Sequence, residues 1–242
     1  MMRDTLKTAL KCFLSVLIVD LMCFFIYGSF VTVALSLGET EINGYQVITY
    51  NEEGMPLESV YCTKEEKEEK VKTFEADGTE YTAQEIKVLT ESTSNFVETL
   101  TGICSFLILF AMVYTSTWSR GDKDYSEETF AGVPVDKFRG LKIGLFATAP
   151  IALVYLYFLV DKFAAAEYYG LGALKTTNYY LFPIVNGIAG SASTANDVPA
   201  LSAFLLLVTL IVIPLISVLG YYLGSHGISI KEKLLYVKKE KK

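Results

Sequence analysis

Asp20 is the residue whose chemistry stands out most in this sequence, because it lies in the middle of an otherwise apolar run. The run extends from Cys12 to Leu37 and holds no other charged residue. A charge at the centre of a membrane helix costs at least ~2.5–3.5 kcal/mol to insert, so such residues face protein or water and often mark functional sites. Asp20 is therefore the intramembrane polar candidate.

Three interpretations of Asp20 are open. In the first, its carboxyl group pairs with a hydroxyl group of another membrane helix, such as Thr148, Ser217 or a tyrosine of the third apolar run. In the second, it pairs with a basic residue in a membrane helix of a partner subunit. In the third, it binds a cation or carries a proton in transport, and Pro150 and Pro214 bend the helices that line the route.

Two pairs of glycines are candidates for helix packing. Gly140 and Gly144 lie near the cytoplasmic end of the third predicted span, and Gly220 and Gly224 near that of the fourth, each pair separated by three residues. This spacing removes side-chain bulk from one face of a helix and lets backbones approach closely. Because the two runs are antiparallel, we expect the two pairs to pack together within the chain. Homodimerisation is the alternative.

The sequence predicts no catalytic residue, no cofactor and no metal site. His226 is the only histidine, and a Ser-His-Asp triad, a multi-histidine zinc site or an HExxH motif would all need it or lack a ligand. The phosphate-binding pattern GxxxxGK[ST] and the spacing of an EF-hand loop are absent. The pattern favours a role in binding over a role in catalysis.

The elements that must position Asp20 are four apolar runs. The chain of 242 residues is 52% hydrophobic, with a mean hydropathy of +0.37, and about 20 helical residues cross a hydrocarbon core of ~30 Å. The predicted fold class is an all-α membrane protein, a four-helix bundle with a small β-containing insert between the first and second helices. The predicted segments are residues 1–37 (first helix), 38–95 (insert), 96–118 (second helix), 119–140 (loop), 141–163 (third helix), 164–197 (loop), 198–224 (fourth helix) and 225–242 (tail).

A cleavable signal peptide is an alternative interpretation of the first run. Ala34-Leu35-Ser36 has the small-x-small pattern of a cleavage site. The run is about twice as long as the usual apolar core of a signal peptide, and it contains Asp20. A first transmembrane helix is therefore the preferred interpretation.

The insert of residues 38–95 is acidic and small. It contains fourteen acidic and five basic residues, a net charge of −9. Residues 45–50 and 60–62 are predicted to form one hairpin, and residues 71–74 and 81–82 a second around Asp77-Gly78. The charged residues 64–70 between them are predicted to form a solvated face or an exposed turn. Fewer than 60 residues are marginal for independent stability, so we expect the insert to depend on the bundle or on a partner.

Cysteines and tyrosines add two smaller expectations. Cys62 is the only cysteine of the insert, which excludes a disulfide within it. The tyrosines of residues 164–197 are typical of an interfacial aromatic belt. Leu181–Val185 is apolar but too short to span, so this segment is expected to be a loop lying on the membrane surface or, as the alternative, a re-entrant segment.

The distribution of basic residues predicts the orientation of the chain. Fourteen lysines and arginines lie in residues 1–11, 120–142 and 231–242, against two in residues 161–197. By the positive-inside rule both termini are cytoplasmic, and the acidic insert lies outside. The lysines of the tail are expected to bind anionic lipid headgroups, at about 1 kcal/mol each. The acidic insert would repel phosphate, so nucleic acid is not an expected partner.

Residues 219–236 and 180–186 carry a family resemblance. The segment LGYYLGSHGISIKEKLLY, in which a glycine-containing span runs into a basic tail, is similar to the closing segment of a group of uncharacterised bacterial multi-pass membrane proteins. YLFPIVN resembles a segment before their last span. The resemblance implies a multi-pass protein of a bacterial cell membrane and brings no activity with it.

The leading functional hypothesis is a non-enzymatic accessory or interaction subunit. Its expected partners are the lipid bilayer and another membrane protein or a second copy of itself. A small oligomeric transporter or channel using Asp20 is the first alternative, although four spans are few for a monomeric transporter. A membrane-embedded enzyme is the least favoured alternative.

Overall fold

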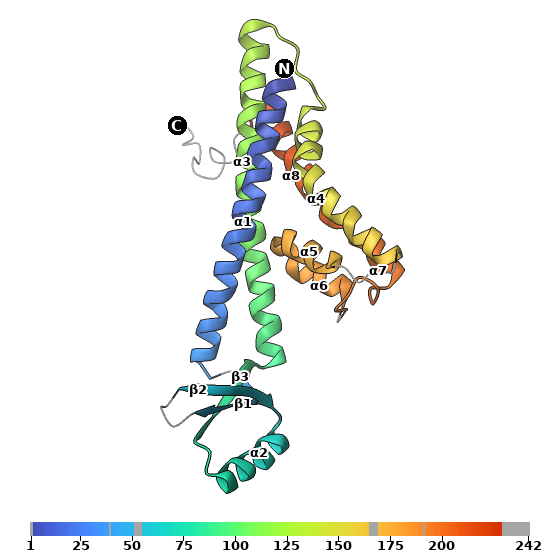
Figure 1. Ribbon diagram of the computed structural model, residues 1–242. Helices are drawn as coiled ribbons and strands as arrows, with labels where there is room; N and C mark the ends of the chain where they lie inside the picture. Colours follow the sequence, from blue (N-terminus) through green and yellow to red (C-terminus); the bar gives the residue numbers. More distant parts are fainter. Residues whose placement is uncertain (1, 39, 51–54, 165–168, 191, 229–242) are drawn as a thin grey trace, which may run out of the picture. The chain divides into compact units, whose positions relative to one another are not determined.

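The computed structural model describes every residue except 1, 39, 51–54, 165–168, 191 and 229–242 (Figure 1). The chain divides into two compact units. The first comprises Met1–Ile26 and Glu98–Lys242, and the second comprises Tyr27–Val97. We call them the membrane unit and the sheet unit.

Four helical stretches are long and apolar enough to cross a membrane, which confirms the central expectation from the sequence. Much of their apolar surface is exposed: Leu21, Leu153 and Leu215 are each more than 60% accessible. Such exposure suits helices whose surroundings are lipid. The stretches are α1 (Met2–Ser36), α3 (Glu91–Ala131), α4 (Arg139–Phe163) and the pair α7 (Ala200–Leu205) and α8 (Val208–Ser225).

Two of these helices differ from the predicted boundaries. The predicted loop of residues 119–140 is largely helical, because α3 continues to Ala131. Hydropathy marks only the apolar part of a helix, and the continuation is polar. The fourth stretch is interrupted at Leu206–Leu207, where Leu207 and Thr209 donate backbone hydrogen bonds to carbonyls three residues earlier, at 3.0 and 3.1 Å. The interruption therefore lies before Pro214, which is inside α8.

Residues 164–197 contain three short helices rather than a loop on the surface. They are α5 (Gly170–Thr177), the 3₁₀ helix η1 (Tyr179–Leu181) and α6 (Phe182–Ala189). Leu174, Tyr180 and Val185 are buried. In Figure 1, α5 and α6 lie between α4 and the neighbouring parts of α1 and α3. Their apolar side chains thus belong to the core of the membrane unit.

The sheet unit contains three antiparallel strands in the order β2-β1-β3. They are β1 (Thr40–Tyr50), β2 (Pro56–Cys62) and β3 (Tyr81–Leu89). The first predicted hairpin is confirmed, since β1 pairs with β2 and Val47 lies opposite Val60. Ala83 of β3 lies opposite Val47 on the other side.

The second predicted hairpin is wrong, because residues 71–74 belong to a helix. This helix, α2 (Lys64–Asp77), replaces the hairpin strand and also contains the charged residues 64–70. The sequence supports it locally: Thr63 and Glu66 form a capping box, with Thr63 N donating to Glu66 Oε2 at 2.9 Å. Glutamate and lysine favour helices, and Gly78 ends this one with φ +70°. The strand β3 pairs with β1 instead.

Candidate functional site

A buried ionic cluster surrounds Asp124 in the membrane unit. Asp124 on α3 is 3% exposed, and Arg139 at the start of α4 is 2% exposed. Arg139 Nη1 donates to both oxygens of Asp124 at 2.8 Å. Arg120, one turn earlier on α3, donates to Oδ1 at 2.6 Å, and the hydroxyl of Tyr221 on α8 donates to Oδ2 at 2.6 Å.

This Asp124 cluster joins all four of the long helical stretches. Arg139 Nε donates to Thr5 Oγ1 on α1 at 3.1 Å, so α1, α3, α4 and α8 each contribute a side chain. A buried ion pair is stable only when hydrogen bonds satisfy both charges, and here each oxygen of Asp124 has at least two donors. The cluster is suited to clamping the helices together.

Sequence reasoning missed this cluster. It counted Arg120 and Arg139 among the basic residues of a cytoplasmic loop and gave Asp124 no role. The available signal was local: Arg120 and Asp124 are four residues apart, the spacing of neighbours on one helix face. The longer-range contact with Arg139 depends on the fold.

Asp20 lies beside the 3₁₀ helix η1. The backbone N–H groups of Tyr180 and Tyr179 donate to its carboxylate. One turn along α1, Cys23 Sγ donates to the carbonyl of Tyr179 at 3.5 Å, and Ser105 Oγ on α3 donates to Cys23 Sγ at 2.8 Å. Oδ1 of Asp20 is buried and has no hydrogen-bond partner among the described residues. We call these residues the Asp20 cluster.

Three of the hydroxyl groups that the sequence suggested for Asp20 have other hydrogen-bond partners or none. Thr148 Oγ1 donates to a carbonyl of its own helix at 2.9 Å. The hydroxyl of Tyr155 donates to the carbonyl of Ala203 at 2.8 Å. Ser217 Oγ is buried, with no partner within the described parts of the chain. Backbone N–H groups of a short helix, which no side-chain pattern in the sequence reveals, occupy the place that the hydroxyls were expected to fill.

The first glycine pair packs against α8. A Cβ atom added at Gly140 would lie 2.7 Å from Cβ of Tyr221. One added at Gly144 would lie 2.5 Å from Cα of Pro214. Both glycines therefore allow α4 and α8 to approach more closely than any larger residue would permit.

The second glycine pair contacts α3 and not the first pair, which differs from the expected pairing. A Cβ atom at Gly220 would lie 2.8 Å from the carbonyl oxygen of Tyr114, and one at Gly224 would lie 2.9 Å from N of Asp122. Gly121 on α3 faces the same contact from the other side, where an added Cβ atom would lie 2.7 Å from N of Ser225. The spacing showed which positions pack closely, and only the fold shows against which helix.

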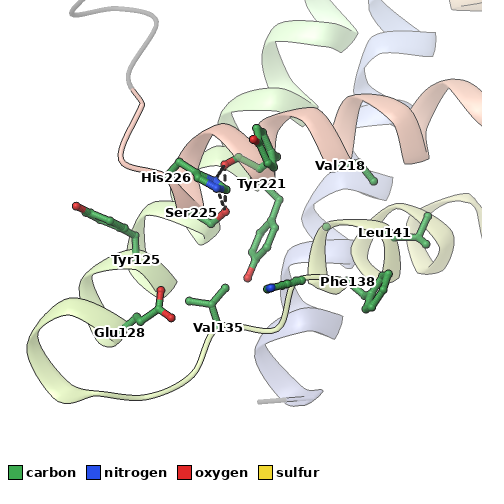
Figure 2. Close-up of a pocket in the computed structure, with 12 residues that line it drawn as sticks. Tyr125, Glu128, Val135, Phe138, Leu141, Val218, Tyr221, Ser225 and His226 are labelled. Carbon is green, nitrogen blue, oxygen red and sulfur yellow. Dashed lines mark hydrogen bonds between the residues drawn. The ribbon is translucent and has the colours of Figure 1, made fainter.

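A cavity of about 800 Å³ adjoins the Asp124 cluster (Figure 2). Tyr221 belongs to both, since its ring lines the cavity while its hydroxyl binds Asp124. Four of the lining residues are tyrosine or phenylalanine, and His226 adds an imidazole ring. Nδ1 of His226 lies 2.8 Å from the carbonyl oxygen of Tyr222. We call it the aromatic cavity; its lining residues are Tyr125, Glu128, Val135, Lys137, Phe138, Gly140, Leu141, Val218, Tyr221, Tyr222, Ser225 and His226.

Two further expectations concern metal binding and the lysines of the tail. Within the described residues, no group of three or more His, Cys, Asp or Glu side chains is placed to hold a metal ion. The lysines of the tail, expected to contact lipid headgroups, lie outside the described residues.

Comparisons of the chain with protein-family models, curated proteins and solved structures gave no match. The function is therefore inferred from the residues and their geometry.

Proposed function

We propose that the chain is a four-span membrane protein that acts as a non-enzymatic accessory subunit and binds a partner protein through its sheet unit. The proposed arrangement is a four-helix bundle with both termini in the cytoplasm and the sheet unit outside. The excess of lysine and arginine in residues 1–11 and 120–142 supports this orientation. The resemblance of residues 219–236 supports a bacterial cell membrane as the location.

The observation that carries the proposal is the edge strand β2. In the order β2-β1-β3, one side of β2 has no neighbouring strand among the described residues. Its side chains Leu57 and Tyr61 are 68% and 70% exposed. Open apolar edges are normally short, charged or covered, because they pair readily with other chains. An extended segment of a partner can add to such an edge, with main-chain hydrogen bonds giving the affinity.

The small core of the sheet unit also favours a bound partner. Its buried apolar residues are Tyr45, Val47 and Cys62. They are covered by the half-buried side chains of Phe74 on α2 and of Tyr81 and Ala83 on β3. A core of this size leaves a domain marginally stable, and a protein that covers β2 would add apolar burial.

Substituting Tyr61 with lysine tests the proposal. A lysine on an edge strand opposes the addition of a partner strand. In native electrophoresis of gently solubilised membranes, wild type should migrate as a complex with its partner, and Tyr61→Lys should migrate as the free chain. Ala76→Lys, an exposed position of α2 with the same change in charge, is the matched control and should leave the complex intact. A wild-type chain that migrates strictly as a monomer would contradict the proposal.

Transport is the second candidate, and the buried Oδ1 of Asp20 is the observation that favours it. An oxygen without a partner in the protein is available to a cation or a proton. Purified protein in liposomes distinguishes the two functions. Ion flux that wild type supports and Asp20→Asn abolishes would establish transport, while equal leakage from both would leave the accessory role.

A further inference from the structure

The aromatic cavity lies where two membrane helices end. The helix α4 begins at Arg139 and α8 ends at Ser225. One wall of the cavity is apolar, formed by Phe138, Leu141 and Val218, and each of these side chains is exposed. At the end of a membrane helix, such a wall meets the boundary between acyl chains and headgroups.

Two charged residues of opposite sign line the same cavity. Glu128 and Lys137 are exposed, and neither forms an ion pair within the part of the chain that the structure describes. The neighbouring charges differ, since Asp136 binds Lys142 at 2.7 Å and Arg120 binds Asp124. The cavity thus offers one acid and one base that no other described residue pairs.

An aromatic ring, that of Tyr125, lies on the acidic side of the cavity (Figure 2). Tyr125 precedes Glu128 by three residues on α3, so the two share a helix face. In Figure 2, Tyr125 and Glu128 lie on one side of the cavity, and Phe138, Leu141 and Val218 lie on the other. Tyrosine rings beside a carboxylate are suited to an ammonium group, which is attracted to both.

We propose that the aromatic cavity binds the headgroup of a zwitterionic phospholipid. Lys137 holds the phosphate, while Glu128 and the ring of Tyr125 hold the amine. The acyl chains lie along Leu141 and Val218. An anionic lipid without an amine would leave Glu128 next to a negative headgroup, and a purely cationic amphiphile would leave Lys137 next to a positive one. A volume of about 800 Å³ is large enough for such a headgroup.

Lipid retention by the purified full chain tests this inference. The chain is extracted from liposomes of phosphatidylethanolamine and phosphatidylglycerol with identical acyl chains, and the bound lipid is identified by native mass spectrometry. Wild type should retain phosphatidylethanolamine in preference. Lys137→Glu should lower this retention by up to about fivefold, the effect of losing one partly exposed ion pair.

Charge exchange sharpens the test. Glu128→Lys should shift the preference towards phosphatidylglycerol, because both charges of the cavity are then positive. The double variant Glu128→Lys/Lys137→Glu should regain phosphatidylethanolamine. Lys123→Glu, on the same helix but outside the cavity lining, should behave as wild type.

Three results would overturn the proposal. They are equal retention of the two lipids by wild type, retention of neither lipid, and the same lipid preference in wild type and in both single variants. Glu128→Gln and Lys137→Gln are milder replacements at these exposed positions, and they give the same comparison if a charge reversal lowers the yield of folded protein.

Discussion

Two carboxylates of the membrane unit differ in how the protein satisfies them. Asp124 receives hydrogen bonds from Arg120, Arg139 and Tyr221. Asp20 accepts hydrogen bonds from backbone N–H groups at Tyr180, and its Oδ1 has no hydrogen-bond partner among the described residues. A charge that is fully paired serves to hold helices together, whereas a charge that is only partly satisfied remains available to something outside the chain.

Arg139→Ala tests the paired side of this comparison, and the largest effect is expected here. Removing one partner of a buried pair leaves an uncompensated charge, so the variant should lose about 3–5 kcal/mol of unfolding free energy. Denaturation of the purified protein in mixed micelles, followed by circular dichroism, measures the loss. Lys142→Ala is the comparison, because it removes the ion pair between Asp136 and an exposed lysine. It should lower the unfolding free energy by under about 1 kcal/mol. Equal effects of the two variants would show that Asp124 is not a clamp.

Tyr221→Phe removes a single donor from Asp124 and leaves both arginines in place. A hydrogen bond to a charged group contributes about 1.5–3 kcal/mol, so the loss should be clear but smaller than that of Arg139→Ala. Tyr222→Phe is the matched control, because Tyr222 is exposed. The same denaturation experiment measures both variants. An unfolding free energy of Tyr221→Phe equal to that of wild type would contradict the contact between Tyr221 and Asp124.

Asp20→Asn tests the other side of the comparison. Asparagine keeps an oxygen that accepts from the backbone at Tyr180 while it removes the buried charge. The unfolding free energy should change by less than about 1 kcal/mol, in contrast with Arg139→Ala. A loss of 3 kcal/mol or more would make Asp20 a second clamp and would remove the reason to assign it another role.

The pair of Asp136 and Lys142 predicts the smallest effect, a dependence of stability on pH. The hydrogen bond from the Lys142 ammonium holds the pKa of the Asp136 carboxyl below its usual range, and burial opposes this shift. A lowered pKa means that the stabilisation is complete above the unfolded pKa of about 3.8 and is lost as the pH falls through the folded pKa. Wild type should therefore lose under about 1 kcal/mol more than Asp136→Asn between pH 6 and pH 3. Identical pH profiles would contradict the interaction.

The sequence predicted what depends on local composition. The four apolar runs were long enough to indicate four membrane-length helices, and the β-branched and aromatic residues on either side of a turn cluster indicated the first hairpin. The helix α2 was missed, although Thr63 and Glu66 form a capping box that the sequence displays. The charged run has no apolar period that would indicate a helix, and the dipeptide Asp77-Gly78 suggested a hairpin turn instead.

The candidate sites depended more on the fold than on the sequence. Asp20 was recognised because a charge in an apolar run is conspicuous, but its backbone partners near Tyr180 leave no trace in residue types. Asp124 was overlooked because a polar continuation of a helix resembles a loop. The glycines were recognised from spacing alone, whereas the helix that each pair contacts is decided by the rotation of α8 about its axis.

The orientation of the chain underlies every proposed role, because it decides which side of the membrane holds the sheet unit and which holds the aromatic cavity. The native Cys62 is an unsuitable probe, since it is buried at 8% exposure. Lys72 on α2 and Lys123 on α3 are exposed, and each can be replaced by cysteine.

Labelling these two variants with a membrane-impermeant maleimide in intact cells is the most direct test. The proposed topology predicts that Lys72→Cys is labelled in intact cells and that Lys123→Cys is labelled only after the cells are opened. The reverse pattern, or labelling of both positions in intact cells, would contradict it.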